Sequence, residues 1–253
     1  MKNDKKVLFI FGCQRSGTTA TLNYFKTIKN IRTFEEHGDI IHDDNKTRDG
    51  IYTLRLCNYV RLKEIINNQK EDKVVVKPLV ESQYAKHILQ SIPNSVGIWI
   101  YRNPKDAVAS MITKWGKRVG DDFIDAVINN LENNWRNEAL NNEIKNFIIN
   151  TQKRCKFLTS QDKAALFWYV RNSLYFSQEL HFNPKISKIR YYYLVNRKPY
   201  LPNKLLQLGY DIKVKEINTF NKKSIGKGKD VKLHPIINQL CFDLFERFNE
   251  SWN

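Results

Sequence analysis

The chain has 253 residues, 42% of them hydrophobic and 12% aromatic, which is enough apolar material for a folded domain and excludes a disordered chain. Its 42 lysines and arginines exceed its 26 acids, and the formal net charge of +16 favours an anionic partner without choosing its class. No apolar run approaches the roughly 20 residues of a membrane span, and the N-terminal apolar stretch is too short for a signal peptide.

Short apolar runs alternate with helical patterns along the chain. We expect strands at 7–11, 31–34, 73–77, 96–101 and 188–195, and helices at 17–29, about 54–68, 81–91, 160–181 and 235–251. The strand runs are continuous, which is typical of strands buried on both faces of a parallel sheet. The alternation predicts an α/β fold with a doubly wound, mostly parallel β-sheet flanked by helices.

Two polar stretches interrupt this pattern. Residues 121–160 are rich in asparagine, and we expect an inserted helical lobe or a cover there. Residues 221–234 predict a long basic loop, and such loops in compact domains are usually functional or disordered. Because neither an internal repeat nor a low-complexity linker separates the elements, we expect a single domain over 1–253.

The segment "GCQRSGTT" directly follows the first predicted strand. Gly12 and Gly17 have the spacing of a P-loop, whose backbone N–H groups point at an anion. Thr18 replaces the lysine of a nucleotide-hydrolysing loop, while Thr19 and Arg15 add donors for a tetrahedral oxyanion. A divergent P-loop nucleotide kinase is an alternative, but it would need that lysine and a carboxylate at a strand end for Mg²⁺.

The other predicted strands also end in polar residues. Glu35 and Glu36 follow the second strand, Lys77 ends the third, and Arg102 follows the fourth. The carboxyl ends of parallel strands meet at one edge of a sheet, where ligands bind in open α/β folds. We therefore expect these side chains at one edge, with Ser110 on the helix that follows Arg102.

The loop "FGCQRSGTT", a strand ending in lysine and the segment "YRNPKDAVAS" together resemble the sulfotransferases that use 3′-phosphoadenosine 5′-phosphosulfate (PAPS). The resemblance covers 7–115 well and 160–210 weakly. It implies a P-loop-like sulfotransferase fold and in-line, metal-independent transfer of a sulfuryl group to an acceptor hydroxyl of a saccharide, a tyrosine or another acceptor. It further implies that the 3′-phosphate is bound by Arg102 and Ser110, and the phosphosulfate by Arg15, Ser16, Gly17, Thr18 and Thr19.

An acceptor hydroxyl loses its proton during such a transfer, so a base should lie near the donor. The motif pattern is most similar to the tyrosylprotein and heparan-type branch, whose base is a carboxylate. This resemblance implies that Glu36 is the base, with Glu35 as the second choice and His37 or His42 as weaker ones. It also implies that Lys77 neutralises charge on the leaving group. The histidine of the cytosolic small-molecule branch is missing from "VKPLVES".

Two later segments resemble the family more weakly. In "KIRYYYLV", Tyr191 would contact the adenine, while Tyr192 and Tyr193 replace the acidic pair that the family has there. The basic loop at 221–234 resembles the loop that closes over the nucleotide, which implies that Lys227 and Lys229 contact the cofactor.

The partners follow from this resemblance and from the charge. We expect PAPS as donor, adenosine 3′,5′-bisphosphate (PAP) as product and a hydroxyl-bearing acceptor, for which the basic charge favours acidic groups. We expect no metal, no transmembrane segment and no nucleic acid; a basic nucleic-acid-binding module is a second alternative, but no recognition motif supports it. Four widely spaced cysteines predict free thiols in the cytoplasm: Cys13, Cys57, Cys155 and Cys241.

Overall fold

The protein is described here by a computed structural model. It describes residues 5–36, 40, 47–48, 51–52, 55–130, 134–197, 199–212 and 220–250. Contacts between residues divide the chain into two compact units. Unit 1 contains residues 1–101 and 175–222, and unit 2 contains residues 102–174 and 223–252.

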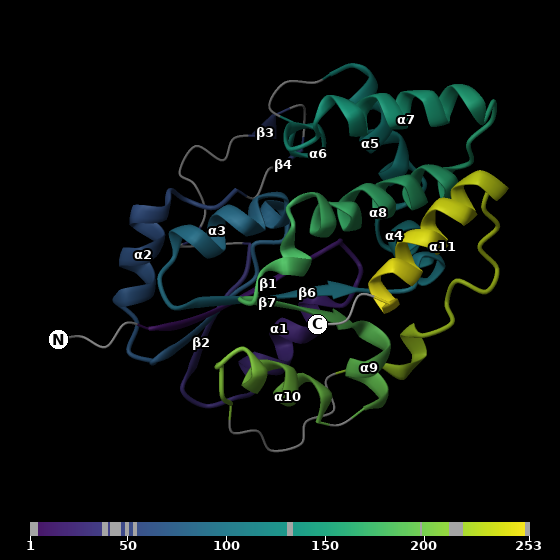
Figure 1. Ribbon diagram of the computed structural model, residues 1–253. Coiled ribbons are helices and arrows are strands. Elements are labelled where there is room, and N and C mark those ends of the chain that lie inside the picture. Colours follow the sequence, from purple (N-terminus) through teal and green to yellow (C-terminus); the bar gives the residue numbers. More distant parts are fainter. Residues whose placement is uncertain are drawn as a thin grey trace. The chain divides into compact units, whose positions relative to one another are not determined.

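Unit 1 is built on a five-stranded sheet whose strand order is β2-β5-β1-β6-β7 (Figure 1). The strands are β1 (Lys6–Gly12), β2 (Ile31–Phe34), β5 (Lys73–Val76), β6 (Ser95–Tyr101) and β7 (Ile186–Arg190). All neighbouring strands of this sheet run parallel. A short antiparallel pair, β3 (Thr47–Arg48) and β4 (Ile51–Tyr52), lies outside it. The predicted α/β fold with a mostly parallel sheet is confirmed.

The central strands form the core of unit 1. Residues 7–11, 74–76 and 98–100 are at most 1% exposed, so side chains on both faces of the sheet are buried. This explains why the strands have continuous apolar runs in the sequence instead of an alternating pattern.

Helices cover both faces of this sheet. They are α1 (Thr18–Lys26), α2 (Tyr59–Asn67), η1 (Val80–Tyr84), α3 (Ala85–Ser91), η2 (Leu180–Phe182), α9 (Tyr191–Asn196) and α10 (Tyr200–Gln207). Figure 1 shows α2 and α3 on one face and α1 and α10 on the other. The chain winds from β1 toward β2 in one direction and from β5 toward β6 in the other, so the winding reverses at β1. Ligands of open α/β sheets bind at such a reversal.

Unit 2 is helical. Its helices are α4 (Pro104–Trp115), α5 (Arg118–Ile128), α6 (Trp135–Glu138), α7 (Asn142–Arg154), most of α8 (Ser160–Ser177) and α11 (Pro235–Glu250). The rings of Phe123 and Trp135 pack on Phe167, with centroid distances of 5.3 and 6.0 Å. Within 121–160 the described residues form most of α5, then α6 and α7, and after the short turn η3 (Lys222–Ser224) residues 225–234 form a loop. No described helix is long and apolar enough to cross a membrane.

One predicted element is wrong in part. The strand expected over 188–195 ends at Arg190, and α9 begins at Tyr191. Tyr191 and Leu194 are the buried residues of this segment, and a spacing of three places both on one side of a helix. Burial of these two side chains therefore overrides the strand preference of the aromatic run.

Candidate active site

The loop between β1 and α1, residues 12–17, is called the glycine loop below. Gly12 has a φ of 137°, and a Cβ there would lie 2.4 Å from the carbonyl oxygen of Ile100. Gly17 has a φ of 105°, and its Cβ would lie 2.2 Å from the ring of Tyr191. Both the backbone conformation and the close neighbours therefore require glycine at these positions.

The end of the glycine loop carries several groups that can bind an anion. The first turn of α1 contains no acidic residue, and no side chain caps its N-terminus at Gly17. Ser16 is fully buried, and its hydroxyl has no hydrogen-bond partner among the described residues. Thr18 is buried and Thr19 is exposed. Burial lowers the pKa of Arg15, but a guanidinium still carries its charge at neutral pH.

Lys77 and Glu36 form a buried ion pair next to this loop. The Nζ of Lys77 lies 2.9 Å from the Oε2 of Glu36 and 3.4 Å from the Oγ1 of Thr19. The other carboxylate oxygen of Glu36 accepts a hydrogen bond of 2.9 Å from the backbone N–H of Leu79. The side chains of Lys77 and Glu36 are only 4% and 13% exposed. The structure thus brings a carboxylate, a lysine and a hydroxyl of α1 together.

Glu35 has a different partner. It pairs with Lys26 of α1, and both side chains of this pair are well exposed. Of the two glutamates proposed from the sequence, the structure therefore brings only Glu36 into contact with Lys77. The weaker candidates His37 and His42 lie outside the described residues.

The residues at the end of β7 and the start of α9 bring aromatic side chains to the glycine loop and to Arg190. Tyr191 is 4% exposed, and its ring lies against Gly17. The guanidinium of Arg190 lies 5.5 and 5.6 Å from the ring centroids of Tyr192 and Tyr193. Tyr192 and Tyr193 stand where the family that the sequence resembles has two acids. At these positions the chain therefore has two aromatic rings next to an arginine.

Sequence reasoning missed a hydrogen-bonded support behind the glycine loop. The buried hydroxyl of Ser82 accepts a hydrogen bond of 3.1 Å from the backbone N–H of Gly12. The carbonyl of Ser82 accepts one of 3.0 Å from the amide of Gln178, whose oxygen accepts one of 3.1 Å from the N–H of Lys86. The one sequence feature that could have indicated this role of Ser82 is its position shortly after Lys77. The segment after β5 therefore supports both the glycine loop and Glu36.

In unit 2, the first turn of α4 contacts the basic loop. Arg102 is 5% exposed, donates a hydrogen bond to the carbonyl of Ser224, and lies 4.0 Å from the carboxylate of Asp106. This carboxylate accepts hydrogen bonds of 3.0 and 2.8 Å from the N–H groups of Gly226 and Gly228. Asp106 thus holds the loop near Arg102.

Three further residues from the sequence analysis lie on the same two segments of unit 2. Ser110 lies on α4, about two helical turns after Arg102, and is 8% exposed. Lys227 and Lys229 are exposed on the basic loop, on either side of the buried Gly228. A Cβ at Gly228 would lie 2.3 Å from the backbone of Lys105, so the two segments approach closely.

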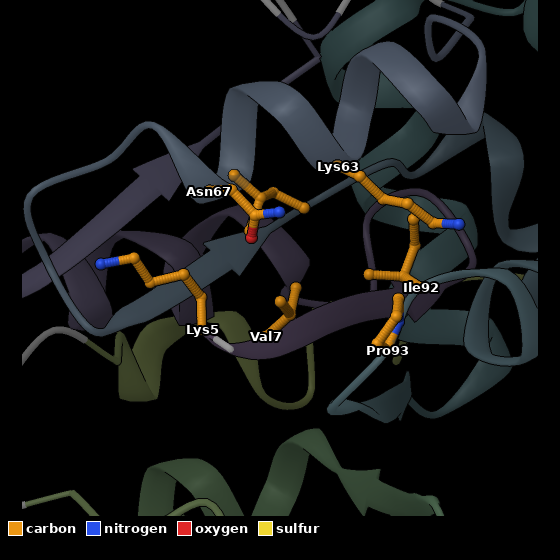
Figure 2. A pocket seen from close by; sticks show the side chains of 7 residues that line it. Lys5, Val7, Lys63, Asn67, Ile92 and Pro93 are labelled. Atoms are coloured by element: carbon orange, nitrogen blue, oxygen red, sulfur yellow. The ribbon is translucent and has the colours of Figure 1, made fainter. Parts of the chain in front are cut away.

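A small pocket lies elsewhere in unit 1 (Figure 2). It is lined by Val7 at the start of β1, by residues of α2, and by Ile92 and Pro93 just before β6. These positions are at the amino ends of the strands, whereas the glycine loop follows the carboxyl end of β1. We therefore place the candidate active site at the glycine loop and not at this pocket.

Comparisons with known proteins identify the family of the chain. A sulfotransferase domain model matches residues 5–151, which is more than half of the chain. The chain therefore belongs to the sulfotransferase family, and it is an enzyme that transfers a sulfuryl group. A search of curated proteins found no match.

Solved structures resemble the chain in fold. A sulfotransferase from Alicyclobacillus acidocaldarius aligns with a TM-score of 0.51 and 12% identity, over 98% of this chain and 92% of that chain. The mouse sulfotransferase SULT7A1, complexed with PAP, aligns with a TM-score of 0.44 and 14% identity, over 96% and 84% of the two chains. The first of these similarities supports the α/β sulfotransferase fold.

Proposed function

We propose that this sulfotransferase uses PAPS and transfers its sulfuryl group to an acceptor hydroxyl in line, without a metal. PAPS is the donor that the family uses in general. The observation that carries the proposal is the contact of Lys77 with both Thr19, just after the glycine loop, and Glu36. Lys77, the cation proposed for the leaving group, therefore lies within hydrogen-bonding distance of both a candidate base and a hydroxyl just after the proposed donor-binding loop. The family assignment favours this reaction over phosphoryl transfer by a divergent kinase.

The phosphosulfate would bind at the glycine loop. The buried hydroxyl of Ser16 has no partner among the described residues and would donate to a phosphate or sulfuryl oxygen. The backbone N–H groups at Gly17, Thr18 and Thr19 begin α1 and would add further donors. Arg15 would supply charge at the open side of this cradle, where it is partly exposed. These groups fit a tetrahedral anion held without a resident cation.

Glu36 and Lys77 would carry the chemical step. Glu36 accepts the proton of the acceptor hydroxyl while the new oxygen–sulfur bond forms. The bond between sulfur and the bridging oxygen breaks, and its electron pair stays on the phosphate of PAP. Lys77 stabilises that developing charge, and the N–H of Leu79 keeps the carboxylate of Glu36 in place.

The nucleotide end of the donor would use other residues. We propose that Arg102 and Ser110 bind the 3′-phosphate, that Lys227 and Lys229 add positive charge, and that Tyr191 contacts the adenine. The buried position of Arg102 supports this role, because Asp106 and Ser224 fix its guanidinium before a ligand arrives. A pre-oriented guanidinium loses less entropy on binding a phosphate.

Acceptor and compartment belong to the same proposal. A carboxylate base suits a saccharide, a tyrosine or another hydroxyl, and the charge of +16 favours acidic acceptors. We propose a cytoplasmic enzyme, which is supported by four cysteines that are all free thiols.

Glu36→Gln tests the chemical roles, with the neighbouring Glu35→Gln as matched control. PAP formation from PAPS is followed over a panel of phenols, tyrosine peptides and saccharides. Loss of a general base should lower kcat of Glu36→Gln by about 10²–10⁴-fold, while PAP binding is retained. Glu35→Gln should stay near the wild type. Equal losses in both variants, or full activity of Glu36→Gln, would exclude Glu36 as the base.

A further inference from the structure

One end of unit 2 brings together two connections between helices. Residues 116–117 lead into α5 and residues 155–159 lead into α8. The first turns of these two helices are in contact, because Lys163 of α8 pairs with Asp121 of α5. A Cβ at Gly120 would lie only 2.6 Å from the backbone nitrogen of Ala164. The two connections therefore lie at the same end of the unit.

Each connection carries an exposed aromatic side chain. Phe157 is 90% exposed, more than any other large hydrophobic side chain among the described residues. Trp115, the last residue of α4, is 45% exposed. Side chains of this size are normally covered, and their exposure at one end of a unit indicates an interaction surface.

Exposed cations lie close to both aromatic residues along the chain, and one more lies on a segment that contacts α8. They are Lys114, Lys117, Arg118, Lys153, Arg154, Lys156 and Lys232. Lys232 belongs here because its backbone N–H donates to the side chain of Gln161 in the first turn of α8, at 2.9 Å. Figure 1 shows the α7–α8 connection beside the segment that leads into α11.

The carboxylates in the first turns of α5 and α8, Asp121 and Asp162, do not cancel the charge of these cations. Asp121 is paired with Lys163, and Asp162 is 2% exposed. Asp162 accepts hydrogen bonds from Thr159 and from the backbone of His234. The seven cations with Phe157 and Trp115 are called the aromatic–basic end.

We propose that the aromatic–basic end is a peripheral binding site for a bilayer that contains anionic lipids. Phe157 enters the boundary between headgroups and acyl chains, and Trp115 lies at the level of the headgroups, where tryptophan is favoured. The cations bind lipid phosphates, and each adds to the attraction by a negative surface. A phenyl ring that is 90% exposed protrudes, whereas stacking of nucleic-acid bases uses rings along a groove. The protein therefore binds the membrane surface without a spanning helix.

Binding to large unilamellar vesicles tests this proposal. Sedimentation is compared for neutral phosphatidylcholine and for phosphatidylcholine with 30 mol% phosphatidylglycerol, at low and high salt. The wild type should bind the anionic vesicles, and salt should weaken the binding. Replacing Lys153, Arg154 and Lys156 by glutamine should weaken it by at least about tenfold. The matched control replaces Lys29, Lys70 and Lys185, three exposed lysines of unit 1, and should change it little.

Insertion is tested separately with Phe157→Trp and Phe182→Trp. Phe182 of unit 1 is 79% exposed and serves as the matched position. Only Phe157→Trp should gain a blue-shifted fluorescence that brominated lipids quench. Circular dichroism confirms that each variant is folded.

Three results would overturn the proposal: no vesicle binding, equal binding to neutral and anionic vesicles, or equal losses in the two sets of replacements. A single-stranded oligonucleotide is the comparison ligand. If the Lys153, Arg154 and Lys156 replacements weaken its binding while no vesicles are bound, the surface binds nucleic acid and the membrane proposal is wrong.

Discussion

Single residues of the glycine loop are constrained by what surrounds them. A side chain at Gly17 meets the ring of Tyr191, and one at Gly12 meets the backbone of β6. The same loop holds the buried hydroxyl of Ser16. The close packing that excludes side chains therefore also fixes the donors that we propose for the phosphosulfate.

Gly17→Ala should reduce the free energy of unfolding by about 1–3 kcal/mol, because alanine is strained at positive φ and its Cβ clashes with Tyr191. Gly116→Ala is the control, since Gly116 also has a positive φ, of 77°, but no atom lies within 4 Å of a Cβ there. Urea denaturation measures both variants. An equal effect in the two would mean that contact with Tyr191 adds nothing.

Ser82→Ala should leave the buried N–H of Gly12 without its partner, at a cost of about 1–3 kcal/mol. Because this bond supports the glycine loop, we also expect weaker binding of PAP. Ser91→Ala, at a half-buried position of α3, is the control. Denaturation and calorimetry measure the two effects. Unchanged stability together with unchanged PAP affinity would show that Ser82 does not position the loop.

Candidate site residues were easier to propose from the sequence than the residues that support them. Glu36 and Lys77 could be proposed because each lies at a strand end, and the structure brings them into contact. Ser82 could not, because its bond to Gly12 joins positions 70 residues apart and depends on how β1 and β5 pair. Local patterns do not contain such contacts.

At the scale of elements, strands with buried faces could be predicted from the sequence. The predicted and observed bounds of the second strand agree at 31–34, and those of the three central strands differ by at most one residue at each end. The strand at 188–195 failed because burial of Tyr191 and Leu194 turns its second half into α9. Propensity describes the chain locally, whereas the change at Tyr191 depends on tertiary packing.

Lys188 on β7 makes stability depend on pH. Burial, and then the charge of Lys204, lower the pKa of Lys188 from 10.5 to about 8. Between these values the unfolded chain binds a proton that the folded protein has released, so this lysine's contribution to stability rises with pH and is lost as the pH falls toward 8.

Lys188→Met should therefore stabilise the protein most at pH 7.5, and its advantage over the wild type should shrink by pH 10. Denaturation curves across this range measure the difference. Lys185→Met controls for the loss of one exposed lysine just before the same strand. A Lys188→Met advantage that does not change with pH would contradict the lowered pKa.

At the scale of the whole molecule, the sequence predicted the enzyme family through motifs on elements that are far apart in the chain. "GCQRSGTT" follows β1 and "RNPKDAVAS" follows β6, and the family model spans both. The acceptor could not be predicted in the same way, because a net charge of +16 is spread over many surface residues and selects no particular hydroxyl. Only the structure assembles part of that charge into the aromatic–basic end of unit 2.

Calorimetric titration with PAP tests the central claim, that the chain binds the PAPS nucleotide without a metal. It is done with EDTA on the wild type, on Arg102→Ala and on Lys105→Ala, a neighbouring basic residue with no proposed role, with ATP–Mg²⁺ as the comparison ligand. The account predicts metal-independent PAP binding by the wild type, weakened by about 1–3 kcal/mol in Arg102→Ala and little changed in Lys105→Ala. No PAP binding, or a preference for ATP–Mg²⁺, would contradict it.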